Sequence, residues 1–385
     1  MTGPWPTQTL EKLITLEKGK KAPDVFATPS NTRLRYLQIA DLRPGATFKY
    51  CEPFNCPRAT KADVVIAWDG ANAGTVSCNL EGYIGSTLAV LRPAAEGILR
   101  PPFLSRFLQS KFDYLQSTAI GATIPHISKS ALTSLAIPVP PLEEQDRIVR
   151  LLDEADELQR LRVEADYDTN GLLPALFYQM FGDPDANPFS WPIKRAGELM
   201  TACDYGTSQK ANGDGVGVPV LRMGNVGVDG RLDLANIKHI ELSDSELENY
   251  QLRSGDVLFN RTNSRELVGK TGMWDGRLEA VAASYFIRVR FREDMEHPQH
   301  FTMFMNLPSM KRRLASMARG AVGQANINAK ELRAIEIPVP PIERQREFAA
   351  RADEVRLLQG AQSVSGHRLN DLRQSMLQRA FLKEL

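Results

Sequence analysis

Three short segments of the sequence have residue types that could bind a phosphate, a dinucleotide or a flipped base. Gly269-Lys-Thr271 resembles the end of a phosphate-binding loop, but Ser264 stands where that loop requires its first glycine. Gly213-Asp-Gly-Val-Gly217 leads into Val218 without the spacing of a dinucleotide fingerprint. Asn187–Ser190 lacks the second proline with which amino-methyltransferases hold a flipped base. None of the three segments predicts a catalytic site.

Cysteine and histidine residues also fail to form a recognisable site. Cys51 and Cys56 are close in sequence, but no second pair of Cys or His completes a zinc site. The five histidines are scattered, and the four cysteines are too few for a disulfide framework, which favours a reducing, cytoplasmic compartment. We therefore expect no catalytic residue, no metal ligand and no cofactor bound by this chain.

The composition bounds the remaining classes of protein. The chain has 385 residues, 43% of them hydrophobic, which is enough for two or three globular domains. No apolar run reaches the ~20 residues that cross a bilayer, so we expect no membrane contact. The net charge of +1 does not by itself indicate a nucleic-acid partner, so that indication must come from where the charges lie.

Basic and amide side chains are concentrated in two irregular stretches. Residues 18–50 contain seven basic and two acidic side chains. The second stretch offers Lys210, Arg222, Arg261, Asn263, Arg265 and Lys270. Lys and Arg bind phosphates, whereas Arg, Asn and Gln can also read base edges. The alternative is that these residues are merely solvated loops, but two such clusters together favour contact with a nucleic acid.

The chain repeats itself once, which decides its architecture. Ile137-Pro-Val-Pro-Pro141 recurs 200 residues later as Ile337-Pro-Val-Pro-Pro341, and each copy is followed by a hydrophobic residue and Glu-x-Gln. Upstream, Asp63-Val-Val matches Asp256-Val-Leu at the shorter offset of 193 residues. Two copies with so long a period indicate duplication of a whole domain and its connector, not a solenoid.

Each repeat is predicted to begin with a β-rich, irregular domain. The strands are expected at residues 35–39, 63–67, 218–223, 256–259 and 285–291, which are β-branched or aromatic and flanked by Gly, Ser or Asp. Asp63 and Asp256 are expected to cap turns before their strands rather than to bind a ligand.

Each repeat is predicted to end in a long helical connector that starts directly after Pro-Pro, where proline suits the first turn. Apolar residues at three- and four-residue steps form a coiled-coil-like stripe, so Leu151, Leu158, Phe348 and Val355 are expected to be buried. Asn170-Gly171 and, in the second connector, Gly366 are expected to divide each connector into two helical segments.

The charges of the two connectors differ in sign. Residues 143–168 carry ten acidic and four basic side chains, whereas residues 343–384 carry six acidic and eight basic ones. An acidic and a basic helix with matching apolar stripes are expected to pack against each other. The alternative is that each charged face is only solvated.

The sequence resembles the specificity (S) subunits of type I restriction-modification enzymes. The two Ile-Pro-Val-Pro-Pro segments carry this resemblance, and Pro219–Asn225 and Gly255–Ser264 add to it in the second repeat. The resemblance implies an α+β fold, in which two β-rich target recognition domains are separated by two long helices. These helices would form an antiparallel coiled-coil-like spacer, and the whole chain a pseudo-two-fold internal repeat. The implied boundaries are 1–140 and 184–340 for the domains, and 141–183 and 341–385 for the helical connectors.

The resemblance also implies a function. Each recognition domain would read one half of a split site in double-stranded DNA. The helices would fix the gap between the half-sites and dock two modification subunits, which bind S-adenosylmethionine, and restriction subunits, which use ATP and Mg²⁺. The chain itself would catalyse nothing. Two alternatives are a stand-alone DNA- or protein-binding scaffold and an enzyme with its own recognition domains, although no cofactor or metal motif supports the latter.

The residues expected to carry these roles fall into three sets. In the first domain the DNA-binding residues are expected to be Lys18, Lys20, Lys21, Arg35, Gln38, Trp68 and Asn72. In the second domain they are expected to be Tyr205, Thr207, Ser208, Lys210, Arg222, Asn225, Asn260, Arg261, Asn263, Ser264 and Lys270. The spacer and subunit-docking residues are expected to be Ile148, Leu151, Leu158, Phe348, Val355, Leu372 and Met376.

Overall fold

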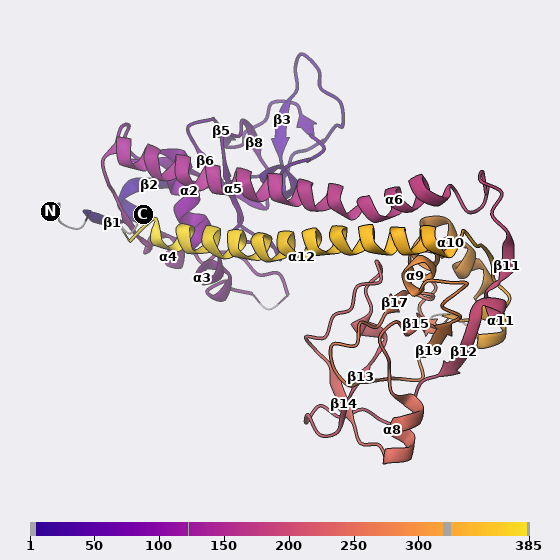
Figure 1. The fold of residues 1–385 in the computed structure, drawn as a ribbon. Helices are drawn as coiled ribbons and strands as arrows, with labels where there is room; N and C mark the ends of the chain where they lie inside the picture. The colour runs from indigo at the N-terminus through magenta and orange to yellow at the C-terminus, as the bar shows by residue number, and fades with distance from the viewer. Residues whose placement is uncertain (1–4, 122, 319–324, 383–385) are drawn as a thin grey trace. The chain divides into compact units, whose positions relative to one another are not determined.

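The computed structural model describes residues 5–121, 123–318 and 325–382, and the chain divides into two compact units. The first unit comprises residues 1–164 and 364–385, and the second comprises residues 165–363. Each unit therefore contains one β-rich domain together with parts of both long helices (Figure 1).

The first domain contains two four-stranded sheets and four short helices. Its strands are β1 Thr7–Thr9, β2 Ile14–Lys18, β3 Leu34–Leu37, β4 Tyr50–Cys51, β5 Arg58–Ala59, β6 Val64–Ala67, β7 Val76–Cys78, β8 Gly82–Ile84, β9 Leu88–Pro93 and β10 Ala136–Pro138. Its helices are α1 Leu10–Leu13, α2 Pro101–Ser110, α3 Phe112–Ser117 and α4 Lys129–Thr133, with a 3₁₀ turn η1 at Ile39–Leu42. The sheets have the orders β2-β9-β6-β7 and β4-β3-β8-β5, and β1 pairs with β10.

The second domain follows the same plan. Its strands are β11 Ile193–Arg195, β12 Met200–Tyr205, β13 Val218–Leu221, β14 Lys238–Ile240, β15 Val257–Asn260, β16 Thr262–Asn263, β17 Thr271–Met273, β18 Val281–Ala282, β19 Phe286–Phe291, β20 Ala325–Asn326 and β21 Glu336–Pro338. Its helices are α7 Ala196–Leu199, α8 Asp244–Tyr250, α9 Pro298–Asn306, α10 Pro308–Met317 and α11 Ala329–Arg333, with a 3₁₀ turn η2 at Met223–Asn225. The order β12-β19-β15-β17 repeats that of the first domain, which confirms the predicted duplication.

Strand β6 is apolar and buried at every position because both faces of its sheet are covered. In β6, Val64 and Ile66 pack with Phe103 of α2, whereas Val65 and Ala67 face the second sheet. The predicted strands at residues 63–67, 256–259 and 285–291 are confirmed within one residue or so.

The strands predicted at residues 35–39 and 218–223 end earlier than expected. β3 stops at Leu37 and β13 at Leu221, and a 3₁₀ turn follows each of them. The Asp41 carboxylate accepts from the Gln38 backbone N–H at 2.7 Å, and the Asn225 amide oxygen accepts from the Arg222 N–H at 2.9 Å. These side chains give the backbone an alternative to the sheet, which is why the chain turns there.

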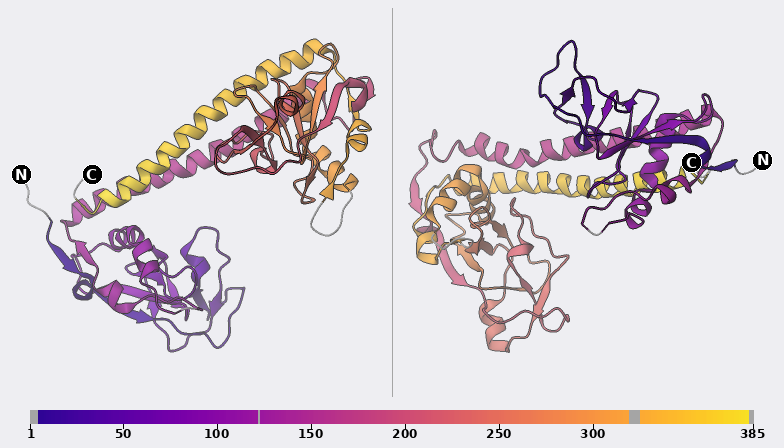
Figure 2. Two further views of the ribbon diagram at one scale, coloured as in Figure 1. Left: turned by 90° about the horizontal axis from the view of Figure 1, so that it is seen from below. Right: turned by 180° about the vertical axis from the view of Figure 1, so that it is seen from behind.

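The long helices are α5 (Leu142–Asn170), α6 (Leu172–Phe181) and α12 (Ile342–Arg379). The first connector divides at Gly171 as predicted, but the second is one unbroken helix, and both views of Figure 2 show it without a break. The prediction of a division at Gly366 is therefore wrong. A lone glycine in a helix costs only about 1 kcal/mol, and no proline follows it as Pro174 follows Gly171.

Segments of the long helices run antiparallel within each unit. In the first unit, Asp156 forms an ion pair with Arg373 at 3.1 Å, and Ile148 belongs to the same core cluster as Phe381. In the second unit, the Thr169 hydroxyl donates to Gln362 at 2.8 Å, and the Phe181 ring lies 5.4 Å from that of Phe348.

Fewer residues of the long helices are buried than the apolar stripe in the sequence predicted. Ile148 and Phe348 are fully buried, and Leu151, Val355 and Met376 are half-buried. The expectation that Leu158 is buried is wrong, because its side chain is 55% exposed, as is that of Leu372. The buried face of α5 passes through Leu152 and Ala155. No helix in the described parts of the chain is long and apolar enough to cross a membrane.

Candidate nucleic-acid interface

A buried asparagine at the end of β15 shapes the loop that carries most of the predicted base-reading residues. The Asn260 side chain is fully buried and donates to the carbonyl oxygens of Thr262 at 3.3 Å and Tyr285 at 3.2 Å. Its amide oxygen accepts from the Asn263 side chain at 2.7 Å, and the Asn263 amide oxygen accepts from the Ser264 N–H at 2.9 Å. Asn260 therefore holds Asn263 and Ser264, which are partly exposed, in a fixed arrangement.

Arg261, the next residue, lies over an aromatic ring from the neighbouring part of the sheet. Its guanidinium carbon is 4.7 Å from the centre of the Tyr205 ring, and its Nη1 donates weakly to the Ser284 carbonyl at 3.5 Å. Tyr205 is 45% exposed at the end of β12, and its hydroxyl accepts from the Ala329 N–H at 3.1 Å. The structure thus brings Tyr205 and Arg261 together, with the arginine pre-oriented by stacking.

A glycine with no room for a side chain fixes the segment after β12. A Cβ at Gly206 would lie 2.2 Å from the Ala282 carbonyl oxygen. The Thr207 N–H donates to that same oxygen at 2.9 Å, and the Thr207 side chain is buried. Ser208 and Lys210, which follow, are exposed. The predicted run therefore begins with the anchored residues Tyr205 and Thr207 and continues with the exposed residues Ser208 and Lys210.

The lysine run of the first domain contains an equivalent glycine, Gly19, that also has no room for a side chain. A Cβ at Gly19 would lie 2.2 Å from the Ile84 carbonyl oxygen, and the Lys20 N–H donates to that oxygen at 3.0 Å. Lys18, Lys20 and Lys21 are all exposed. Lys18 pairs with Asp69 at 2.9 Å, and the Lys20 ammonium donates to a carbonyl at 2.9 Å.

Arg222 and Gln38 occupy equivalent positions, each directly before a 3₁₀ turn. Gln38 is exposed, and Arg222 is half-buried with its Nη2 donating to the Asn236 carbonyl at 3.3 Å. Arg35 pairs with the buried Asp41 at 2.6 Å and lies over the Phe48 ring at 3.8 Å. Each turn therefore presents one polar side chain outward while a buried Asp or Asn holds the backbone.

Several predicted contact residues are buried or bonded within their own domain. Trp68 is 8% exposed and belongs to the main core cluster of the first domain. Asn225 is buried, and its side chain donates to the Asp233 carbonyl at 2.8 Å. Lys270 is also buried, donates to the Met223 carbonyl at 2.8 Å, and has its pKa lowered by desolvation. Asn72 is half-buried and accepts a hydrogen bond from Arg43.

Sequence reasoning missed Lys311 in α10. Its ammonium donates to the Gly269 carbonyl at 2.8 Å, and burial, together with the charge of Lys270, lowers its pKa to about 7. Lys270 and Lys311 thus lie near each other, and each donates to a backbone carbonyl. The only sequence signal was the place of Lys311 beside the buried Met310 in an amphipathic helix, which is a weak one.

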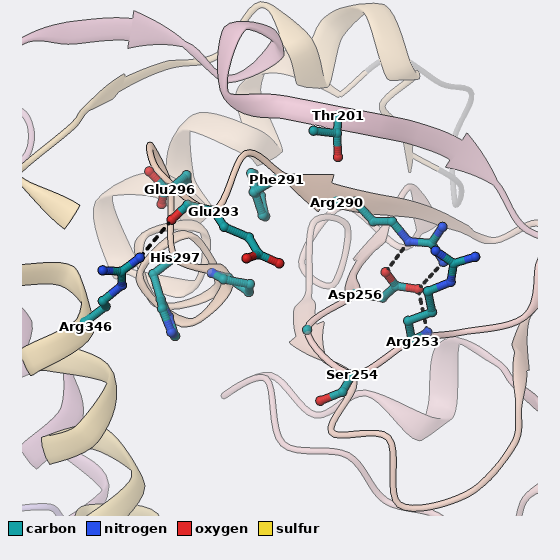
Figure 3. A pocket seen from close by; sticks show the side chains of 12 residues that line it. Thr201, Arg253, Ser254, Asp256, Arg290, Phe291, Glu293, Glu296, His297 and Arg346 are labelled. Carbon is teal, nitrogen blue, oxygen red and sulfur yellow. Dashed lines mark hydrogen bonds and ion pairs between the residues drawn. The ribbon is translucent and has the colours of Figure 1, made fainter. Parts of the chain in front are cut away.

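The two aspartates before the central strands cap turns, as predicted. Asp63 accepts from the Thr60 N–H at 2.7 Å, and Asp256 accepts from the Arg253 N–H at 2.8 Å. Asp256 also pairs with Arg290 at 2.6 Å (Figure 3). A cavity of about 490 Å³ separates this ion pair from Arg346 at the start of α12.

The chain matches known proteins over nearly its whole length. A family model described as type I restriction modification DNA specificity domain matches residues 3–164 and 190–356. The chain is 28% identical over 356 residues to the type I restriction enzyme EcoKI specificity subunit of Escherichia coli K12, which covers 84% of this chain and 75% of that protein. It is 25% identical over 372 residues to the MjaVIII specificity subunit of Methanocaldococcus jannaschii, covering 91% of this chain and 86% of that protein.

Solved structures share the fold. A chain from a study of complex assembly and conformational transition of the type I R-M system matches with a TM-score of 0.65 and 23% identity, covering 100% of this chain and 99% of that one. The type I restriction-modification S subunit of M. genitalium matches with a TM-score of 0.58 and 16% identity, covering 98% and 96%. Because the family model covers both repeats, the chain belongs to the type I restriction-modification DNA specificity family.

Proposed function

We propose that this chain is the DNA-recognition subunit of a type I restriction-modification complex and that it reads a bipartite DNA site with its two domains. The observation that carries this proposal is that the two domains present polar side chains at equivalent places, with different chemistry at each. These places are the ends of β2 and β12, and the 3₁₀ turns that start at Ile39 and Met223. A shared frame with different readers suits two half-sites of different sequence.

The aligned side chains divide into two roles. Arg222 and Arg261 each use one N–H group to bond to a backbone carbonyl, which suits a side chain that must meet one base edge in a defined geometry. Lys18, Lys20 and Lys21 are exposed, which suits sequence-independent phosphate contacts. In this proposal Asn225, Asn260 and Lys270 support the readers from below.

The helices are the proposed docking surface for partner subunits. Leu158, Tyr167, Leu357 and Leu372 are large apolar or aromatic side chains that are 55%, 80%, 75% and 55% exposed. Exposed apolar residues on long helices suit contacts with other proteins. We propose two modification subunits per chain, one for each repeat, and restriction subunits in addition. In this proposal S-adenosylmethionine, ATP and Mg²⁺ bind to those partners.

The test is to select DNA from a random pool with the chain bound to its modification subunits. The expected product is a split sequence with a fixed gap. Arg222→Ala or Arg261→Ala should then relax discrimination at one position of a single half-site, at a cost of ~1–3 kcal/mol on the selected sequence. Arg344→Ala, on the exposed face of α12, is the matched control and should leave the selected sequence unchanged.

Two results would contradict the proposal. Recovery of DNA without any sequence preference would favour a protein-binding scaffold instead. Methyl transfer by the purified chain without partners would favour an enzyme with its own recognition domains.

A further inference from the structure

The same buried glutamine occurs at both junctions between a recognition domain and its long helix. Gln145 lies in the first turn of α5 and is fully buried. Its amide oxygen accepts from the Arg100 N–H at 2.8 Å. Its amide nitrogen donates to the carbonyl oxygens of Ile98 and Pro140, both at 2.9 Å.

The second junction repeats this arrangement bond for bond. Gln345 is fully buried in the first turn of α12. Its amide oxygen accepts from the His297 N–H at 2.8 Å, and its nitrogen donates to Met295 at 3.2 Å and Pro340 at 2.8 Å. Two independent copies of one set of bonds indicate a shared requirement of the junction.

The chemistry of this position favours glutamine over other residues. A planar amide supplies one acceptor and two donors, and here all three are used. Glutamate would lack the donors, and a methionine of similar shape would leave the Arg100 or His297 N–H and two carbonyl groups unpaired. A buried polar group without a partner is costly, so these bonds resist being broken one at a time.

The bonds connect particular parts of the molecule. Arg100 and His297 are the N-cap residues of α2 and α9, the helices that pack on the central sheets. Pro140 and Pro340 belong to the Pro-Pro segments that enter the long helices, and proline has no N–H with which to anchor itself. The glutamine therefore ties the start of each long helix to the frame of its recognition domain across a segment with few bonds of its own.

We propose that Gln145 and Gln345 are positioning residues that fix the direction in which each long helix leaves its recognition domain, and so restrict the gap between half-sites that the protein accepts. This inference rests on the proposed function. A rigid junction at both ends means that one length of DNA fits best, whereas a loose junction lets either domain swing to meet a half-site displaced by a base pair.

The test uses the full chain with its modification subunits and the selected DNA at three gaps: the selected one, one base pair shorter and one base pair longer. The variants are Gln145→Met, Gln345→Met and both together. Each single variant should lose about three- to tenfold of the discrimination between gaps, which corresponds to the net contribution of about one of the three lost hydrogen bonds. Base preference within each half-site should be unchanged.

A matched control separates positioning from stability. Val65→Ala removes buried methyl groups from the cluster on the opposite side of the sheet and should lower stability without relaxing the gap. Where one glutamine variant fails to fold, its counterpart in the other repeat tests the same arrangement. Faster amide exchange at Arg100 or His297 in the variants should accompany the loss of discrimination.

The outcomes are distinguishable. Folded glutamine variants that keep the wild-type preference for one gap would overturn this inference and leave the proposed function standing. Equal loss of gap discrimination in Val65→Ala would also overturn it. Failure of the wild-type complex to select any split site would overturn the proposed function, and this inference with it.

Discussion

The two repeats differ where the helix that packs on the central sheet, α2 or α9, meets the C-terminal end of a long helical connector. In the first unit, the ring of Phe103 in α2 lies 5.3 Å from that of Phe381. In the second unit, the equivalent position in α9 is His300, which stacks on Phe177 at 5.3 Å. His300 bonds to the Glu296 carboxylate at 2.7 Å, and both are at most 1% exposed.

This difference shows at which positions the two repeats can carry different residues. The supporting layer accepts either an apolar pair or a buried Glu–His pair, provided that the shape of the layer is kept. In contrast, Gln145 and Gln345 are the same residue in both repeats, and so are Gly19 and Gly206. Each glutamine bonds to backbone groups, and each glycine lies too close to a carbonyl oxygen to leave room for a Cβ.

The largest expected effect comes from replacing only one residue of the buried Glu296–His300 pair by its counterpart in the first domain. His300→Phe should leave the Glu296 carboxylate buried without its partner and should lower the free energy of unfolding by about 3–5 kcal/mol. The double variant with Glu296→Leu, which copies the Leu99 and Phe103 of the first domain, should recover most of this loss. Urea unfolding of all four chains of the cycle measures both effects. A double variant that is no more stable than His300→Phe would show that the layers are not interchangeable.

A smaller effect tests the parts that do not vary. Gly206→Ala and Gly19→Ala each place a methyl group against a carbonyl oxygen and should cost about 1–3 kcal/mol through the backbone shift that follows. Binding to the corresponding half-site should weaken, while the other half-site should be read as before. Gly213→Ala, where a Cβ meets nothing within 4 Å, is the matched control. Equal effects of Gly206→Ala and Gly213→Ala on binding would contradict the prediction that the close approach at Gly206 positions the binding segment.

Lys311 should give the second domain a pH response of its own. Because its pKa is lowered from 10.5 to about 7, the unfolded chain binds more protons than the folded chain between these values. The free energy of unfolding should therefore rise with pH across this window, by at most about 1.4 kcal/mol per pH unit from this group. Lys311→Met should flatten the rise, as measured by denaturant unfolding at several pH values. An unchanged slope in the variant would assign the rise to other groups.

The smallest effect concerns the lysines of the first domain. Replacement of Lys18, Lys20 and Lys21 by alanine should weaken binding to selected and random DNA alike. The slope of the logarithm of affinity against the logarithm of salt concentration should become shallower by about 0.9 for each phosphate that the variant no longer neutralises. A weakening confined to one base pair would instead make these lysines base readers.

Local patterns were sufficient to predict much of this fold. The β-branched runs after Asp63 and Asp256 form the central strands, and the Pro-Pro segments begin the long helices. Periodicity was not sufficient to show which stripe residues are covered, because Leu158 and Ile148 follow the same spacing but only Ile148 meets a domain. Gly366 carried no signal that distinguishes a tolerated glycine from a break.

For the candidate site, residue type was predictable but exposure was not. Asn260 and Asn263 are the same residue type three positions apart, yet Asn260 is buried and organises the loop, whereas Asn263 is partly exposed. Trp68 and Arg261 occupy equivalent positions, but the indole lies in the core. The contributions of Gln145 and Lys311 depend on partners about 40 residues or more away, which no local pattern shows.

The first unit is completed by the last described helix of the chain, and this has a consequence for its synthesis. Ala380 and Phe381 belong to the core that contains Phe103 and Phe107. About 200 residues separate the two parts of this unit, so at roughly 5–20 residues per second a ribosome needs about 10–40 s to supply the missing part. During that interval the nascent first domain exposes an aromatic surface. The core of the first unit can therefore be completed only after the second domain and the whole of α12 have been synthesised.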